Sequence, residues 1–420
     1  MKPELLAPAG DFEKLQVAVA YGANAVYIGG KAFSLRANTR NFDDGELEQA
    51  IGYAHGQGVR VYVAANIFAH NQDVAHVLPY FEYLKGIGAD AVIVADLGVL
   101  AVARQVPGLE VHVSTQANIT NYQSANVYKQ LGAKRVILAR ELTFEEVKAL
   151  NQHVADEQFQ TEVFAHGAMC MSYSGRCLLS SYMTGRDANK GDCAQPCRWK
   201  YHLMEEKRPG EYLPVYEDER GTYIMNSKDL CLVEHIPELV ASGVASLKIE
   251  GRMKSAYYVA VTTGVYRQAI DDYFADPALY ESKKGQYVEA LQKASHREFF
   301  TGFFVGGDVA LPIHGAPEGE GTGQNYETNT YTSTYDFLGM VMGYNVESGR
   351  VEVEQRNKFS VGDTVEFMTP SGQHFTHTIV EMYNEKGQPV TAAPHAQERI
   401  YIPVDRPLSP FDMMRMPSKA

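Results

Sequence analysis

The chain has 420 residues, 45% of them hydrophobic and 21% charged, and a formal net charge of −13 at pH 7. This length suits two domains, and the charge argues against broad, non-specific nucleic-acid binding. A local exception is residues 176–208, with seven Lys and Arg against four Asp and Glu. No apolar run reaches the roughly 18 residues that a membrane span needs. Five cysteines without a signal-like N-terminus lead us to expect a cytoplasmic protein.

A strand-and-helix unit repeats through the first 250 residues. A short β-branched strand is followed by an amphipathic helix, such as Phe12–Tyr21, and a glycine closes the helix. The expected strands are Glu4–Ala7, Ala25–Ile28, Arg60–Ala64, Ala91–Val94, Glu110–Val113, Arg135–Leu138, Thr161–Ala165 and Ala245–Ile249. Eight such units predict an α/β fold, a (β/α)8 TIM-like barrel over residues 1–305, with a Cys-rich insertion at about 167–231 after the seventh strand. A doubly wound sheet is the alternative, but the chain lacks its Gly-x-Gly-x-x-Gly fingerprint.

A second domain follows the barrel. Helices are expected at Ser255–Tyr273 and Tyr287–Ala294, and the composition of residues 306–334, rich in Gly, Thr, Asn and Glu, indicates a linker. Residues 335–420 change to alternating patterns that predict a small all-β barrel domain. Its expected strands are Leu338–Gly343, Arg350–Glu354, Thr364–Met368, Thr376–Met382 and Arg399–Val404.

Polar side chains gather where the predicted barrel strands end, which is the face where such barrels hold their active sites. Asp11 and Asp96 at these ends are best explained as helix N-caps. We expect substrate binding by Asn66, Gln116, Arg140, Lys248 and Arg252, because a rim with three cations and an amide suits an anionic small molecule. Proton transfer is assigned to Glu141, His166 and Glu250. Rim salt bridges, such as Arg140 with Glu250, explain these residues about equally well.

The cysteines are concentrated in the insertion, as Cys170-x6-Cys177-x15-Cys193-x3-Cys197, with Cys231 further on. An iron–sulfur cluster needs four thiolates and tolerates irregular spacing. A zinc site is an alternative, although only the last pair in the run has the usual short spacing. Cys170, four residues after His166, is a candidate nucleophile that leaves the other cysteines unexplained. Chance clustering of buried structural thiols is the remaining alternative.

Several segments resemble peptidase family U32, the collagenase-like peptidases. They are EVFAHGAMC (residues 162–170), SGRCLLS (174–180), ELLAPAGD (4–11), AVYIGG (25–30) and LKIEGR (247–252). The resemblance covers most of residues 1–300 and implies two kinds of activity. The family was named for collagen-degrading members. Other members are needed to hydroxylate the wobble uridine of tRNA to 5-hydroxyuridine, with prephenate as hydroxyl source. Still others hydroxylate a cytidine of ribosomal RNA.

The resemblance also implies a cofactor. Related members hold a four-iron, four-sulfide (4Fe-4S) cluster on four cysteines, and the matching positions here are Cys170, Cys177, Cys193 and Cys231, with Cys197 as an alternate ligand. We therefore expect a tRNA uridine-hydroxylating enzyme whose partners are tRNA, an anionic small molecule and a paralogous protein subunit. A peptidase is the alternative, although the chain has neither His-Glu-x-x-His nor Gly-x-Ser-x-Gly. A non-catalytic subunit of a modification complex is the second alternative.

Overall fold

The computed structural model describes residues 1–34, 41–170, 228–306 and 331–418, and parts of the chain between them. Those parts are residues 172, 174, 176–177, 179–186, 188–190, 193–194 and 196, and the backbone of 203–204, 212–213, 216–218 and 221–223. Cys197 and most of the predicted linker at 306–334 lie outside the described residues. None of the helices described there combines the length and the apolar character that crossing a membrane requires.

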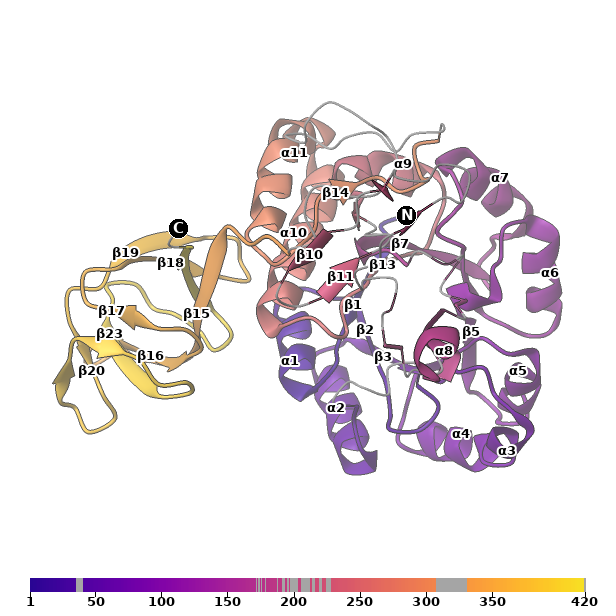
Figure 1. The fold of residues 1–420 in the computed structure, drawn as a ribbon, viewed down its shortest axis with the longest axis horizontal. Helices are drawn as coiled ribbons and strands as arrows, with labels where there is room; N and C mark the ends of the chain where they lie inside the picture. Colours follow the sequence, from indigo (N-terminus) through magenta and orange to yellow (C-terminus); the bar gives the residue numbers. More distant parts are fainter. Residues whose placement is uncertain are drawn as a thin grey trace.

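Eight parallel strands form the closed barrel (Figure 1). They are β1 (Glu4–Pro8), β2 (Ala25–Ile28), β3 (Arg60–Ala64), β4 (Ala91–Val94), β5 (Glu110–Val113), β6 (Arg135–Ile137), β7 (Gln160–Ala168) and β13 (Ser246–Ile249). The ring closes because β13 pairs in parallel with both β1 and β7. The predicted TIM-like barrel is thus confirmed, and each of its expected strands begins within one residue of the observed start.

Helices surround the barrel, polar N-caps start most of them, and one further helix, α8, belongs to the insertion after β7 (Figure 1). Their bounds are α1 (Phe12–Ala20), α2 (Asp44–Gly56), α3 (Asn71–Val74), α4 (Val77–Gly86), α5 (Leu97–Ala103), α6 (Tyr122–Gln130), α7 (Phe144–Val154), α8 (Leu179–Thr184), α9 (Ile236–Ala241), α10 (Ala256–Ala275) and α11 (Pro277–Gln292). Asp11 and Asp96 accept hydrogen bonds from backbone N–H groups in the first turns of α1 and α5, so their expected cap role is confirmed. The expected helix at Tyr287–Ala294 is wrong in its start, because Asp276 caps a helix that begins at Pro277.

Two further strands extend the barrel sheet beyond β7. β12 (Asp229–Cys231) runs antiparallel to the end of β7, and β14 (Phe299–Phe300) pairs with β12. At Gly167, with φ +112°, β7 passes close to the end of β13, since a Cβ there would lie 2.4 Å from the carbonyl oxygen of Glu250. The insertion after β7 therefore returns to the strand that it left. Within it, β8 (Leu203–Met204) pairs with β9 (Tyr212–Leu213), and β10 (Tyr216–Asp218) pairs with β11 (Gly221–Tyr223).

The C-terminal domain is an antiparallel β half-barrel, which confirms the expected all-β barrel domain. Its main sheet has the order β19-β18-β24-β15-β16-β23-β20-β21, and no recorded pairing among the described residues closes it. The strands are β15 (Tyr335–Asn345), β16 (Arg350–Gln355), β17 (Phe359–Ser360), β18 (Thr364–Met368), β19 (Phe375–Thr378), β20 (Met382–Tyr383), β21 (Pro389–Val390), β22 (Ala392–Ala393), β23 (Arg399–Pro403) and β24 (Met413–Pro417). The expected strand Thr376–Met382 is divided between β19 and β20, and β17, β21, β22 and β24 were not predicted.

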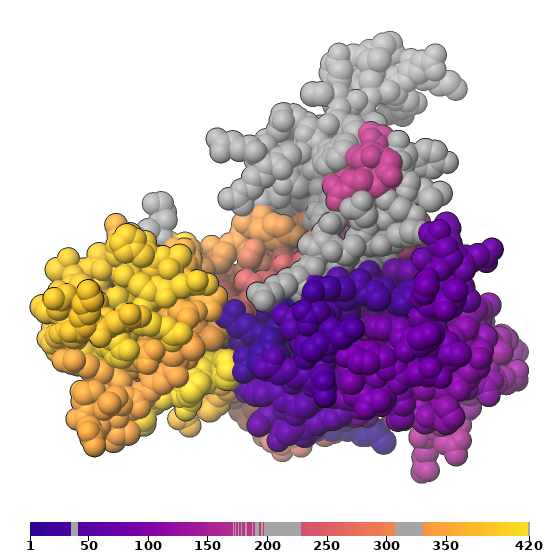
Figure 2. Space-filling view, turned by 90° about the horizontal axis from the view of Figure 1, so that it is seen from below, coloured from indigo at the N-terminus to yellow at the C-terminus, as the bar shows by residue number. Residues whose placement is uncertain are grey.

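The two domains pack side by side and share buried contacts (Figure 2). Met340, Met368 and Met413 of the half-barrel belong to the hydrophobic core of the barrel domain. Across the same boundary Tyr257 of α10 stacks on Phe337, with ring centroids 5.2 Å apart. A shared apolar core resists relative motion of two domains better than a polar contact does.

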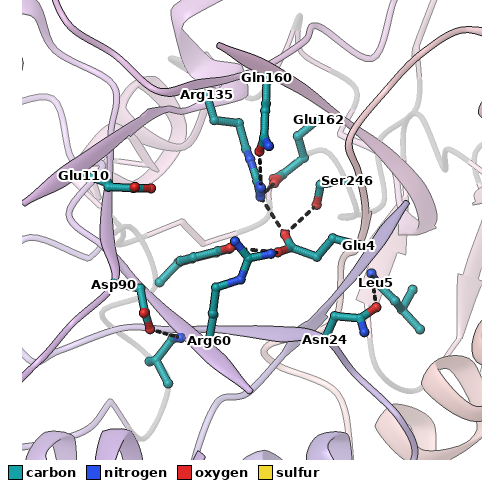
Figure 3. A network of polar contacts seen from close by, with 12 residues as sticks. Glu4, Leu5, Asn24, Arg60, Asp90, Glu110, Arg135, Gln160, Glu162 and Ser246 are labelled. Carbon is teal, nitrogen blue, oxygen red and sulfur yellow. Dashed lines mark hydrogen bonds and ion pairs between the residues drawn. The ribbon is translucent and has the colours of Figure 1, made fainter. Parts of the chain in front are cut away.

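A buried ionic network lies inside the barrel (Figure 3). Arg135 donates hydrogen bonds to Glu4 (2.6 Å) and Glu162 (3.1 Å), and Lys248 Nζ lies 3.2 Å from the other oxygen of Glu162. Arg60 also contacts Glu4. Burial would raise the pKa of Glu162, but the facing Lys248 and Arg135 hold that pKa below its ordinary value. The groups of the network therefore stay charged, and each carboxylate is balanced by a neighbouring cation.

Removing the Glu162 charge is expected to destabilise the protein strongly. Glu162→Gln leaves the buried Lys248 and Arg135 undercompensated, which costs about 3–5 kcal/mol of unfolding free energy in urea denaturation. Glu352→Gln is the matched control: its ion pair with Arg399 is about one-third exposed, so the loss stays below about 1 kcal/mol. The double variant Glu162→Gln, Lys248→Met should lose less than Glu162→Gln alone. Equal losses for Glu162→Gln and the control would contradict this account.

Asp412 predicts a pH dependence of stability. Burial raises the pKa of this carboxyl to about 6, although it accepts a hydrogen bond from the Ser409 N–H. Because the folded chain binds this proton more tightly than the unfolded chain, stability contributed by Asp412 falls as pH rises from about 4 to 6. Asp412→Asn removes this loss and should stabilise the protein by up to about 3 kcal/mol at pH 8, with little effect near pH 4.

Thermal unfolding of both proteins across this pH range measures the effect. Asp405→Asn, at an exposed position of the same domain, is the control and should leave the melting curve nearly unchanged. A melting temperature of Asp412→Asn that matches the wild type at pH 8 would refute the prediction.

Candidate active site at the barrel mouth

Arg140, in the loop after β6, lies at the C-terminal mouth of the barrel. Its Nη1 donates a hydrogen bond to the Ala168 carbonyl (3.1 Å), and its Nη2 lies 3.7 Å from Glu250 Oε2. Its guanidinium also stacks on Phe164, 3.8 Å from the ring centroid. The rim ion pair that the sequence offered as an alternative is therefore present. At 3.7 Å it is an ion pair without a good hydrogen bond.

Lys248 lies deeper, inside the barrel. Its side chain is only 6% exposed and pairs with Glu162, and its ammonium lies 4.4 Å from the ring centroid of Tyr27. It also lies 5.4 Å from the Phe164 centroid, so Phe164 contacts both Lys248 and Arg140. The structure thus brings two of the three predicted cations to one aromatic ring, while the Lys248 charge is already balanced by Glu162.

Arg252 is used to hold the loop after β2. Its Nη2 donates to Ser34 Oγ (2.9 Å) and Asn41 Oδ1 (3.0 Å), and the residue is buried. Gly29 makes room for it: a Cβ at that position would lie 2.6 Å from Arg252 Nη1. These contacts support a structural role for Arg252 beside the mouth.

Asn66 and Gln116 do lie together, as the shared rim predicts. Asn66 Nδ2 donates to Gln116 Oε1 (2.7 Å), which also accepts from Ser114 Oγ (3.1 Å). Arg176 of the insertion donates its Nε hydrogen to the Gln116 carbonyl oxygen (2.7 Å). The side-chain amides therefore join two strand ends, and the backbone carbonyl of Gln116 joins them to the insertion.

Glu141 is a second anchor for the insertion. Its two carboxylate oxygens accept hydrogen bonds from the Ser174 N–H (2.7 Å) and the Ser174 hydroxyl (2.8 Å). Phe68, in the loop after β3, donates its N–H to the Asn189 carbonyl (3.2 Å). The insertion is thus attached at three separate points of the mouth, and the carboxylate of Glu141 is occupied by this attachment.

His166 is packed away among aromatic rings. Its ring lies 5.4 Å from those of Tyr266 and Phe299, and Tyr258 lies nearby. Burial lowers the pKa of His166 to about 3, so the imidazole is neutral at physiological pH. These surroundings favour a core residue over the expected proton-transfer group.

The four described cysteines lie in different surroundings. Cys170 is exposed, Cys177 and Cys193 are half-buried, and Cys231 is buried on β12. The Leu179 N–H donates to Cys177 Sγ (3.4 Å), a contact that suits a thiolate ligand. Burial raises the pKa of Cys231 to about 12, so its thiolate would need a positive partner such as a metal.

The ligand types therefore fit an iron–sulfur cluster, although among the described residues no three His, Cys, Asp or Glu side chains are placed to hold a metal ion. The strand register sets Cys231 opposite His166, four residues before Cys170.

The sequence analysis assigned no role to two side chains that contact the predicted cations, Glu162 and Phe164. Both lie on β7 within a segment recognised as a buried strand. The alternation of a strand places them on the same face, and a charged residue in such a strand is a signal of a buried partner.

Comparison with known proteins identifies the family. Residues 10–310 match peptidase family U32, and residues 333–415 match the peptidase family U32 C-terminal domain. The chain is 41% identical to the tRNA hydroxylation protein P1 of Bacillus subtilis, over 99% of this chain and 94% of that protein. It is 38% identical to the tRNA hydroxylation protein P of Escherichia coli, over 97% and 95% of the two chains. The corresponding protein of Haemophilus influenzae is 38% identical over 93% and 91%. The chain therefore belongs to peptidase family U32.

Proposed function

We propose that this protein is an enzyme that acts on tRNA and is required to hydroxylate the wobble uridine to 5-hydroxyuridine. The observation that carries the proposal is the likeness, over nearly the whole chain, to proteins named for tRNA hydroxylation. Both domains take part in that likeness, so the proposal covers the barrel and the half-barrel together. Prephenate, a dicarboxylate, is the proposed hydroxyl source.

The barrel mouth supports an anionic co-substrate. Arg140 keeps donor capacity on Nη2, because the 3.7 Å contact of that atom with Glu250 is too long for a hydrogen bond, while Nη1 donates to the Ala168 carbonyl. A guanidinium can take a carboxylate through two parallel hydrogen bonds. Asn66 and Gln116 offer amide groups beside the mouth. We assign carboxylate binding to Arg140 first, with the amide pair as a second polar contact.

The cysteines support a 4Fe-4S cluster as the proposed cofactor. Cys170, Cys177, Cys193 and Cys231 are the proposed ligands, with Cys197 as the alternate fourth. When bound, such a cluster would supply one-electron redox chemistry. The chain itself contributes the attachment of the insertion, through Glu141 to Ser174 and through Gln116 to Arg176, which keeps Cys177 beside the mouth.

The family description also raises peptidase activity. A Cys–His pair would be its simplest basis, but His166 is neutral, buried and surrounded by rings. This arrangement gives no support to a Cys170–His166 pair. The tRNA proposal is therefore preferred.

Protein purified without oxygen should contain iron and sulfide, about four of each per chain. Cys170→Ala and Cys231→Ala should lose most of both, because each removes a thiolate ligand. Cys197→Ala is the matched control and should retain the cluster if Cys231 is the fourth ligand. Colourless wild-type protein, or unchanged iron in Cys170→Ala, would disprove the cofactor assignment; loss in Cys197→Ala but not in Cys231→Ala would reassign the fourth ligand.

In a strain that lacks this protein, 5-hydroxyuridine and nucleosides made from it should disappear from tRNA digests analysed by mass spectrometry. The wild-type gene should restore them, whereas Arg140→Ala should restore roughly a tenth or less, since loss of a hydrogen bond to a charged group costs about 1.5–3 kcal/mol. Arg399→Ala, which removes a partly exposed ion pair of the half-barrel, is the control.

Two outcomes would point elsewhere. Unchanged tRNA nucleosides, together with gelatin cleavage that Cys170→Ala abolishes, would favour a peptidase. Nucleosides that depend on this chain only when a second protein copurifies with it would favour a non-catalytic subunit, and the paralogous subunit expected from the sequence would be the first protein to look for.

A further inference from the structure

The ring of Phe164 contacts two cationic side chains at once. The Arg140 guanidinium carbon lies 3.8 Å from the ring centroid, and Lys248 Nζ lies 5.4 Å from it. Both distances are within the range of about 6 Å in which a cation is attracted to an aromatic ring. Phe164 itself is buried, two residues beyond Glu162 on β7. One side chain thus connects the ionic network of the barrel interior with the mouth.

The two cations differ in what else they contact. Lys248 is balanced by Glu162 at 3.2 Å and covered by Tyr27, so its charge serves the interior. Arg140 has a hydrogen bond to a carbonyl oxygen and a 3.7 Å ion pair with Glu250. The guanidinium carbon lies over the Phe164 ring at 3.8 Å, a distance that suits face-to-face stacking, and Nη2, which has a 3.7 Å contact with Glu250, is the donor that remains for a ligand.

Stacking fixes the plane of the guanidinium. A free arginine side chain samples many rotamers, and each must be given up when two parallel bonds to a carboxylate form. A ring that already holds the plane removes part of that cost before the ligand arrives. A lysine or an aliphatic side chain at position 164 could not hold the guanidinium plane, because neither has a flat face to lie against it.

We propose that Phe164 is a positioning residue for the co-substrate: its ring holds Arg140 in the plane in which the guanidinium takes a carboxylate at the barrel mouth. The inference rests on the proposed function, since it concerns the anion that Arg140 binds. It predicts that the aromatic character of residue 164, and not only its apolar volume, sets the affinity for a dicarboxylate.

The test is calorimetric titration of the full chain with prephenate, with wild type, Phe164→Leu and Phe164→Tyr compared at one ionic strength. Phe164→Leu should weaken binding by about three- to thirty-fold, because the ring that holds the guanidinium plane before the ligand arrives is lost. Phe164→Tyr keeps the ring and should bind within about twofold of wild type. Thermal unfolding of each variant verifies that the proteins compared are folded.

A double-mutant cycle shows whether Phe164 acts through Arg140. Arg140→Lys keeps the charge but loses the planar stack, so it should weaken binding by about ten-fold. Adding Phe164→Leu to Arg140→Lys should then cost less than about twofold more, because the two changes remove the same contact. If Phe164→Leu does not fold, Arg140→Lys alone carries the test, and unchanged affinity in that variant overturns the inference.

Failure of this inference and failure of the proposed function give different results. Wild-type protein that binds prephenate while Phe164→Leu binds it equally well overturns the positioning role and leaves the co-substrate intact. Equal losses in Phe164→Leu and Phe164→Tyr also overturn it, since volume or polarity would then be responsible. Wild-type protein that shows no binding at all refutes prephenate as co-substrate, and with it the role given to Phe164.

Discussion

The buried ion pairs around Glu162 are the constraint on which the barrel depends. Glu162 is fully buried and faces Arg135 and Lys248, and Arg135 in turn holds Glu4 on β1. Because an unpaired charge in this interior would be costly, strands β1, β6, β7 and β13 have to arrive in the register that joins these groups. The interior of this barrel is thus specified by charge pairing as well as by apolar packing.

Strand β7 carries this constraint from the interior to the mouth. Glu162 belongs to the ionic network, Phe164 contacts Lys248 and Arg140, and the end of the strand pairs with β12. Its carboxyl end leads directly into the cysteine-containing insertion. Glu162 of the network and Phe164, the proposed positioning residue, are therefore two positions apart on one strand, so a change in strand register would displace both.

Some polar groups at the mouth hold loops in place, and others are assigned to ligand binding. Glu141 and the Gln116 backbone attach the insertion, and Arg252 holds the loop after β2. Arg140 keeps donors at the mouth and is the residue to which we assign the anion. The half-barrel is joined to this domain through methionines that share the apolar core of the barrel.

The sequence alone determined the barrel, its strand positions and the insertion, because β-branched strands, helix caps and closing glycines are local signals. It determined the family through motifs such as those at residues 162–170 and 247–252. The rim positions followed from the same strand ends, whereas the expected set of cysteine ligands followed from the family resemblance. Only the tertiary structure decided which rim residues share contacts: Arg140 with Glu250 and Phe164, but Arg252 with Ser34 and Asn41. It also placed His166 in a ring of aromatic side chains. Such partners come from strands distant in sequence, and their side-chain directions depend on how the closed sheet, its β12 extension and α10 pack together.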